Sequence, residues 1–419
     1  MDSSTLVVVA AIFLVYALLS RRLRGTSITA PMVFVGAGFL FGSEWLGWLH
    51  VTLGQDAVST LAEATLVVVL FTDASRIDVR ALRREYSVPA RLLGIGLPLT
   101  IAAGMLVGAL VLPNVLWAEA AVLAIVLAPT DAALGQAVVT DEALPSRIRQ
   151  GLNVESGLND GLCVPLLAIA LAIAQTDAGD TTATHATKLV VEAIGWGIVG
   201  GVVAGVIAAY ALRAARTRGW IDGHWIQIVP VIAAVGAFGI ADSRGGSGFI
   251  AAFVGGAVFG RISGQDAKSA SFSEELGNVL NGVTLIVFGA AVLGAAWSQI
   301  GLVEVIYAVL SLTVVRMIPV AIALIRTGAA RPTVAFLGWF GPRGLASIVF
   351  GVVVVEAAGL PHTSELVIAL TVTVALSVLV HGITAAPLAR RYAAWYGRSA
   401  APMESVPTPD QRWRHTAHP

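Results

Sequence analysis

The sequence predicts an all-α membrane protein with about thirteen transmembrane helices, and three observations support this fold class. Hydrophobic residues make up 57% of the 419 positions and charged residues only 12%, about half the charged share of soluble domains. A soluble fold cannot bury that much apolar surface, because single cores stop growing at roughly 250–300 residues. The apolar residues gather in stretches long enough to span a bilayer as helices. They show no alternating pattern of the kind that β-barrel strands require.

Charges, prolines and polar loops separate the apolar stretches and so predict each helix in chain order. The expected helices cover residues 4–20, 31–49, 58–73, 89–111, 118–139, 150–175, 187–213, 225–241, 247–260, 275–296, 302–326, 333–357 and 364–389.

The distribution of Lys and Arg tests this count independently. With the N-terminus outside and the C-terminus inside, 22 of the 26 basic residues fall in cytoplasmic segments. Cytoplasmic loops carry such an excess, and a miscounted helix would reverse the bias partway along the chain. We expect an N-out, C-in, multi-pass protein of the cell (inner) membrane, with a transmembrane region over 1–390 and a short cytoplasmic tail over 391–419.

The helix count also permits two inverted repeats, the first to sixth helices and the eighth to thirteenth. Corresponding helices are seven apart, an odd number, so they cross the membrane in opposite directions. The fifth helix contains Pro129 and Gly135, and its counterpart, the twelfth, contains Gly341, Pro342 and Gly344. Interrupted helices in corresponding positions point to the site of a secondary transporter. We expect these two helices to cross at mid-membrane.

Five ionisable side chains lie near the middle of expected helices, where charge is costly and usually functional. They are Asp131 in the fifth helix, Glu155 and Asp160 in the sixth, Arg316 in the eleventh and Arg343 in the twelfth. Three acids face two arginines, so one acid is left to bind something else. Arg316 cannot deprotonate and needs an anionic partner at its depth. We expect that partner to be Glu155, for which Arg343 competes.

The sixth helix offers a cluster of hard oxygen ligands. Ser156 and Asp160 are four residues apart and share one helix face, and Glu155 and Asn159 share the neighbouring face. Thr130 adds a hydroxyl beside Asp131. Such ligands suit a small alkali cation better than a metal that prefers thiolates. An acid that binds a cation only when ionised must choose between the cation and a proton. In a fold with alternating access, that competition is sufficient for antiport.

Three motifs resemble the monovalent cation:proton antiporter superfamily. They are Ala128-Pro129-Thr130-Asp131-Ala132, Glu155-Ser156-Gly157-Leu158-Asn159-Asp160 and Gly341-Pro342-Arg343-Gly344. The Asn159–Asp160 pair is typical of the branch that contains NhaP-like proteins and the eukaryotic sodium/proton exchangers. The chain departs from the pattern at Ala132, where the family commonly has proline, and at Gly157, where it has a bulkier residue.

The resemblance implies a role for each of these positions. Asp160 is the carboxylate that binds the cation and the proton, and Asp131, Thr130 and Ser156 complete an Na⁺ site with it. Asn159 supports the site, and Glu155 pairs with an arginine that matches Arg316. Arg343 is also expected to support the site, because it follows the twelfth-helix break and is placed to neutralise the exposed carbonyl groups there.

The resemblance also implies a homodimer in which a core domain moves like an elevator. The core domain holds the fourth to sixth and eleventh to thirteenth helices. The dimerisation domain holds the first to third and eighth to tenth, and the seventh helix links the two.

We therefore expect electroneutral exchange of a monovalent cation, Na⁺ first, for H⁺. A K⁺/H⁺ antiporter is the alternative, and a proton-coupled carrier of organic solutes is a weaker one. A channel is the main rival mechanism, but it would need a continuous pore with a selectivity ring, and buried arginines beside carboxylates fit a gated binding site better.

The net charge of zero argues against a nucleic-acid partner, so the expected partners are membrane lipid and a second copy of the chain. We expect neither an enzyme nor a cofactor or nucleotide, since the sequence lacks Walker A, His-Glu-x-x-His and Gly-x-Ser-x-Gly motifs.

Three other titratable residues are expected to play structural roles. Glu63 and Asp73 lie in the third helix, with Asp73 close to Arg76 at its end, and both suggest an interfacial role rather than transport. His381 in the last helix is expected to be a buried histidine with satisfied hydrogen bonds, although it has the chemistry of a pH sensor.

Overall fold

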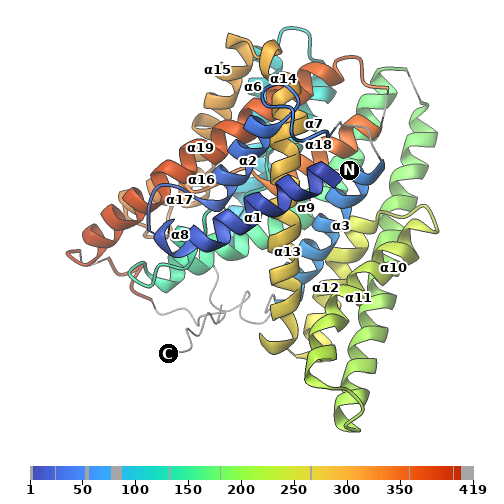
Figure 1. The fold of residues 1–419 in the computed structure, drawn as a ribbon. Helices are drawn as coiled ribbons and strands as arrows, with labels where there is room; N and C mark the ends of the chain where they lie inside the picture. The colour runs from blue at the N-terminus through green and yellow to red at the C-terminus, as the bar shows by residue number, and fades with distance from the viewer. Residues whose placement is uncertain are drawn as a thin grey trace.

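The computed structural model describes residues 3–23, 25–51, 56–76, 87–131, 134–179, 181–264, 267–357, 359–399 and 401–406, and its regular secondary structure there is helical apart from one isolated β-bridge (Figure 1). Within these ranges, nine helices are long and apolar enough to cross a membrane, and four shorter apolar helices accompany them. The thirteen predicted apolar helices are therefore all present. The predicted orientation in the bilayer and the repeat symmetry stay predictions.

The elements of the first half are α1 (Ser3–Leu23), α2 (Ala30–Phe41), α3 (Asp56–Ser75), α5 (Ser87–Arg91), the π-helical segment η1 (Leu92–Gly96), α6 (Leu97–Val111), α7 (Trp117–Val126), α8 (Gln136–Val139), α9 (Ser146–Asp177) and α10 (Ala183–Thr217). Those of the second half are α11 (Gly223–Asp242), α12 (Gly248–Ser263), α13 (Ala267–Val287), η2 (Phe288–Leu293), α14 (Gly294–Ala296), η3 (Trp297–Gln299), α15 (Leu302–Leu312), α16 (Val314–Ala323), α17 (Arg331–Trp339), α18 (Leu345–Glu356) and α19 (Thr363–Tyr396).

Three boundaries differ from the prediction by seven residues or more. The tenth helix, expected to begin at residue 275, begins at Ala267. The second helix, expected to reach residue 49, ends at Phe41 because Gly42 adopts an extended conformation and the chain turns back, so that Gly42 pairs with Leu49. The last helix continues to Tyr396, past the expected start of the tail at residue 391. Of that tail, residues 400 and 407–419 lie outside the described part.

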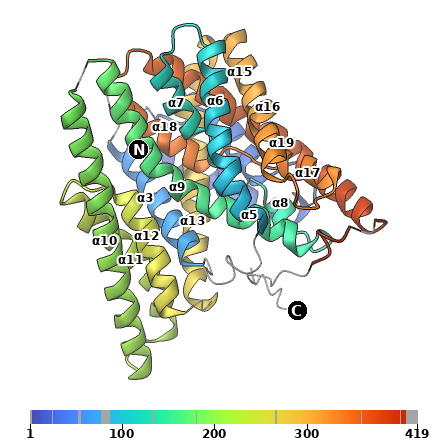
Figure 2. The same ribbon diagram turned by 180° about the vertical axis from the view of Figure 1, so that it is seen from behind.

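The helices form two groups that meet around α9. In one group α3 packs against α11, α12 and α13, and α10 packs along α11 and α12. In the other, α6 packs against α7 and α16, and α19 packs against α15 and α18. Figures 1 and 2 show these groups on opposite sides of the molecule, with α9 in contact with α3 and α7.

Glycines bring α3 and α12 into backbone contact. A Cβ atom at Gly256 or Gly260 would collide with the carbonyl groups of Phe71 and Ser75. Small residues allow this approach in membrane bundles, where dispersion and hydrogen bonding hold helices together. Because α3 carries part of the cavity described below, this contact fixes one wall of the site.

The two interrupted helices meet at their breaks. The fifth predicted helix is divided into α7 and α8, and the twelfth into α17 and α18. The N–H of Asp131 donates to the carbonyl oxygen of Pro342 at 2.8 Å, so each break satisfies a backbone group of the other, as membrane burial requires. The crossing expected from Pro129 and the Gly341–Gly344 motif is therefore present. Ala132, which also belongs to the first motif, lies outside the described residues.

Candidate functional site

Asp131 lies at the first turn of α18. Its Oδ2 accepts a hydrogen bond from the N–H of Leu345 at 3.0 Å, where the positive end of a helix dipole favours a carboxylate. Gly344 makes this approach possible, because a Cβ atom there would collide with the Asp131 side chain. The half-helix created by the twelfth-helix break thus holds the acid contributed by the fifth-helix break.

Two side chains of α9 hold Thr130, the neighbour of Asp131. The hydroxyl of Ser156 donates to the Thr130 carbonyl oxygen. The amide of Asn159 donates to Thr130 Oγ1 at 2.8 Å. All three residues are buried. Asn159 and Ser156 thus tie Thr130, in the fifth-helix break, to α9.

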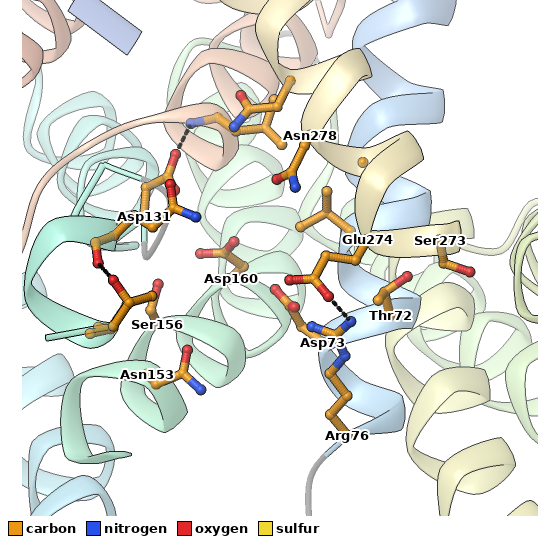
Figure 3. Close-up of a pocket in the computed structure, with 17 residues that line it drawn as sticks. Thr72, Asp73, Arg76, Asp131, Asn153, Ser156, Asp160, Ser273, Glu274 and Asn278 are labelled. Carbon is orange, nitrogen blue, oxygen red and sulfur yellow. Dashed lines mark hydrogen bonds and ion pairs between the residues drawn. The ribbon is translucent and has the colours of Figure 1, made fainter. Parts of the chain in front are cut away.

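Asp160 lies one residue beyond Asn159 and faces a cavity. Its side chain is only 9% exposed, and its Oδ1 has no hydrogen-bond partner among the described residues. A buried polar atom without a protein partner is costly, and water or an ion commonly satisfies such an atom. Figure 3 shows Asp160 between Asp131 on one side and Asp73 on the other.

The cavity measures about 130 Å³, roughly ten times the space that a single water molecule needs. Asp131, Asn153, Ser156 and Asp160 line its α9 side. Three of the four predicted cation ligands therefore line it, whereas Thr130 does not and has both of its oxygens engaged by α9.

The opposite wall comes from α3 and α13, and most of it was missed by sequence reasoning. It contains Thr72, Asp73, Arg76, Ser273, Glu274, Asn278 and Asn281. Asp73, expected to have a structural or interfacial role, lines the cavity. Arg76, at the end of α3, donates to Glu274 of α13 at 2.8 Å and forms an ion pair with it. A recognisable signal was present in the sequence, since asparagines spaced three apart are unusual in an apolar membrane helix.

The predicted buried ion pair is present. Arg316 donates from Nη1 to Glu155 Oε1 at 2.6 Å and from Nη2 to Oε2 at 2.9 Å. Each side chain is 3% exposed. This bidentate geometry is among the strongest that a carboxylate and a guanidinium can form. The pair bridges α9 and α16 behind the cavity and does not line it.

Arg343 neutralises the twelfth-helix break and does not bond to Glu155. Its Nη1 donates to the carbonyl oxygen of Gly341 at 2.6 Å, and its N–H donates to Ser377 Oγ at 2.7 Å. The side chain is fully buried, and Nε and Nη2 have no hydrogen-bond partner among the described residues. His381, bonded to Ser377 and to the Trp339 carbonyl oxygen, is the satisfied buried histidine that the sequence indicated.

The polar groups that line the cavity include hard oxygen donors. Within the described ranges, no three His, Cys, Asp or Glu side chains converge as metal ligands. The site offers carboxylate, hydroxyl and amide oxygens, which suit hard cations.

Curated relatives of this chain are cation/proton antiporters. The chain is 29% identical over 284 residues to the Na⁺/H⁺ antiporter NhaP of Pseudomonas aeruginosa, a match that covers 63% of this chain and 64% of the relative. It is 23% identical over 342 residues to an Na⁺/H⁺ antiporter of Saccharomyces cerevisiae, with 74% of this chain and 33% of the relative covered. The matches thus span less than two thirds of these relatives.

A solved structure shares the fold. The sodium proton antiporter MjNhaP1 of Methanocaldococcus jannaschii, solved at pH 8, superposes with a TM-score of 0.69 at 17% identity, covering 89% of this chain and 97% of that one. The family model described as "Sodium/hydrogen exchanger, transmembrane" matches residues 8–391. With that match running across almost all of its helices, this multi-pass membrane protein belongs to the sodium/hydrogen exchanger family, whose members are transporters.

Proposed function

We propose that this protein is a secondary active transporter that exchanges Na⁺ for H⁺, with the two ions competing for Asp160. The observation that carries this proposal is the unpartnered carboxylate oxygen of Asp160 in a polar cavity beside the crossing of two interrupted helices. A carboxylate binds a cation only when it has released its proton. One such acid, exposed alternately to the two sides of the membrane, couples the two fluxes.

Asp131, Ser156 and Thr130 complete the proposed Na⁺ site. Ser156 donates its proton to the Thr130 carbonyl oxygen, which leaves the lone pairs of the hydroxyl free. If the Ser156 hydroxyl rotated away from Thr130, the Ser156 hydroxyl oxygen and the Thr130 carbonyl oxygen would both be available to a cation. Na⁺ would thus replace a hydrogen bond inside the protein with two oxygen ligands.

The buried charges support exchange of one cation for one proton. Glu155 is held in a buried ion pair with Arg316 and so stays out of the cycle, and Asn159, the neighbour of Asp160, has no proton to release. Asp160 therefore carries either one proton or one monovalent cation. The loaded site has the same charge in both cases, which is the condition for electroneutral exchange.

The lining of the cavity also separates the alternatives. None of the described residues that line it is aromatic, so it lacks the apolar platforms with which organic solutes are usually held. Selectivity between Na⁺ and K⁺ depends on the fit of these oxygens, and a K⁺/H⁺ antiporter is therefore the second candidate.

We extend the proposal to the assembly. The cavity lies between α9 and the wall formed by α3 and α13, where sliding of two helix groups would change its access. We assign α5 to α9 and α15 to α19 to a moving core domain, α1 to α3 and α11 to α14 to a dimerisation domain, and α10 to the link. The protein would act as a homodimer in the cell (inner) membrane, without catalytic activity, cofactor or nucleotide.

Purified protein in proteoliposomes with an internal pH dye tests the proposed function. Na⁺ added after acid loading should dequench the dye, and choline should not. Asp160→Asn, which keeps the side-chain size, is the matched control and should be silent. A response to K⁺ but not to Na⁺ would favour the K⁺/H⁺ alternative. No response to Na⁺, Li⁺ or K⁺ would contradict the antiporter assignment.

A further inference from the structure

A face of α13 points polar side chains at the cavity from the side opposite Asp160. Asn278 and Asn281 are three residues apart, so they lie on neighbouring positions of one helix face, and both line the cavity. Figure 3 shows the Asn278 amide directed into the cavity from α13, across from Asp131. The residues assigned above to the cation site belong to α9 and to the fifth-helix break, so this wall is an additional surface.

The amide oxygen of Asn281, Oδ1, lacks a protein partner among the described residues. Asn281 is 9% exposed. Thr284, three residues further along the same helix, gives the contrast. Its hydroxyl donates to the Leu280 carbonyl oxygen at 3.0 Å and is hydrogen-bonded to Thr65 of α3 at 3.3 Å. On this face of α13, the hydroxyl of Thr284 is hydrogen-bonded where the helix packs against α3, whereas the amide oxygen of Asn281 at the cavity has no hydrogen-bond partner among the described residues.

An uncharged amide oxygen in this position has the chemistry of a cation ligand. Amide carbonyl oxygens are hard donors that alkali and alkaline-earth cations accept. An amide does not titrate, so it cannot hold the exchanged proton. The cavity is too large for a bare ion bound to Asp160 alone to fill, since its volume corresponds to several water molecules. A cation there keeps part of its hydration shell and can contact both walls.

We propose that Asn281 and Asn278 are specificity-determining ligands of the transported cation, which contact a partly hydrated alkali ion, directly or through one water, from the α13 side. This inference rests on the proposed function. It predicts that the cation binds between the two helix groups in the conformation seen here. Because α13 belongs to the group assigned as stationary, the contribution of these amides is limited to the side of the membrane to which the present cavity opens.

The test is the Na⁺ KM measured from each side, in everted and in right-side-out membrane vesicles. Asn281→Ala should raise the Na⁺ KM about fivefold from one side only, equivalent to about 1 kcal/mol of binding free energy. The maximal rate and the proton concentration for half-maximal exchange should stay within about twofold of wild type. Asn278→Ala should shift the Na⁺ KM in the same direction. Thr284→Val, on the same face but bonded to α3, is the matched control and should lower thermal stability without changing KM.

Three results would overturn the inference. The first is a wild-type Na⁺ KM in both asparagine variants, measured in protein that exchanges cations. The second is an equal rise in KM from both sides of the membrane, and the third is the same KM shift in Thr284→Val. If Asn281→Ala does not fold, the Na⁺ KM of Asn278→Ala tests the inference alone. This second variant should fold, because the Asn278 side chain is exposed and lines the cavity. Wild-type protein that exchanges no alkali cation would overturn the proposed function itself.

Discussion

The ion pair between Glu155 and Arg316 is buried so deeply that removal of either partner should affect folding before it affects transport. The two hydrogen bonds measure 2.6 and 2.9 Å and each side chain is 3% exposed. Arg316 is also packed against the twelfth-helix break, since a Cβ atom at Gly341 would collide with its guanidinium. A stranded partner in such a place typically costs about 3–5 kcal/mol, a factor of roughly two hundred to several thousand in the folding equilibrium.

The two single substitutions should not be equivalent. Arg343 interacts electrostatically with both Arg316 and Glu155. In Arg316→Ala, the Glu155 carboxylate keeps a guanidinium nearby, whereas in Glu155→Ala two guanidinium groups face each other without an anion. Glu155→Ala should therefore be the more destabilised variant, and the double variant should be less destabilised than the sum of the two.

Thermal melting in detergent, with the folded fraction measured by gel filtration, gives the required comparison. Glu155→Gln is the matched control, because it keeps the shape of the side chain but not its charge, and it should lie between wild type and Glu155→Ala. Additive losses in the double variant would refute the pairing energy argued here. Greater loss in Arg316→Ala than in Glu155→Ala would refute the role given to Arg343.

Three further predictions follow from the site and its surroundings. Asp160→Asn should abolish exchange with an unchanged melting temperature, while Asp131→Asn should raise the cation KM more than it lowers the maximal rate; normal exchange by the Asp160 variant in proteoliposomes would exclude the assigned site. Exchange should be electroneutral, so clamping the membrane potential with a potassium ionophore should leave the initial rate of Na⁺/H⁺ exchange unchanged. A severalfold change in that rate would contradict the exchange of one cation for one proton. Glu404 is 2% exposed and accepts hydrogen bonds from the Ala330 N–H at 2.9 Å and the Thr333 hydroxyl at 2.5 Å, so Glu404→Ala should cost about 1–3 kcal/mol, measured by thermal melting. An unchanged melting temperature would show that this contact of the tail with α17 contributes no stability.

The helices and the buried pair were predictable because hydropathy and the cost of buried charge act locally. Each apolar stretch is long enough to reveal its own helix, and a guanidinium inside the membrane requires an anion. The early end of α2 was not predictable in the same way. It depends on Gly42 and on the close approach of Gly38 to the Ile286 backbone, a contact between segments far apart in the chain.

The far wall of the cavity was missed for a related reason. The sequence suggests a structural or interfacial role for Asp73 because it lies beside Arg76 at the end of its helix. The packing of α3 against α13 places Asp73 at the cavity and brings Glu274, 198 residues away from Arg76, within hydrogen-bond distance of that arginine. Asn278 and Asn281 carry no charge, so a search restricted to ionisable residues at membrane depth passed over them.

The central claim is that Na⁺ and H⁺ compete for one carboxylate, Asp160, and the pH dependence of the Na⁺ KM tests it most directly. Initial rates of radiolabelled Na⁺ uptake into proteoliposomes, measured over a range of external pH, separate KM from the maximal rate. Competition at one acid predicts that, in the acidic range, the KM rises by about tenfold per pH unit as the pH falls, because each Na⁺ must displace one proton. The maximal rate at saturating Na⁺ should stay constant. A KM that does not change with pH, with a maximal rate that falls on acidification, would place the proton at a separate site and contradict the account.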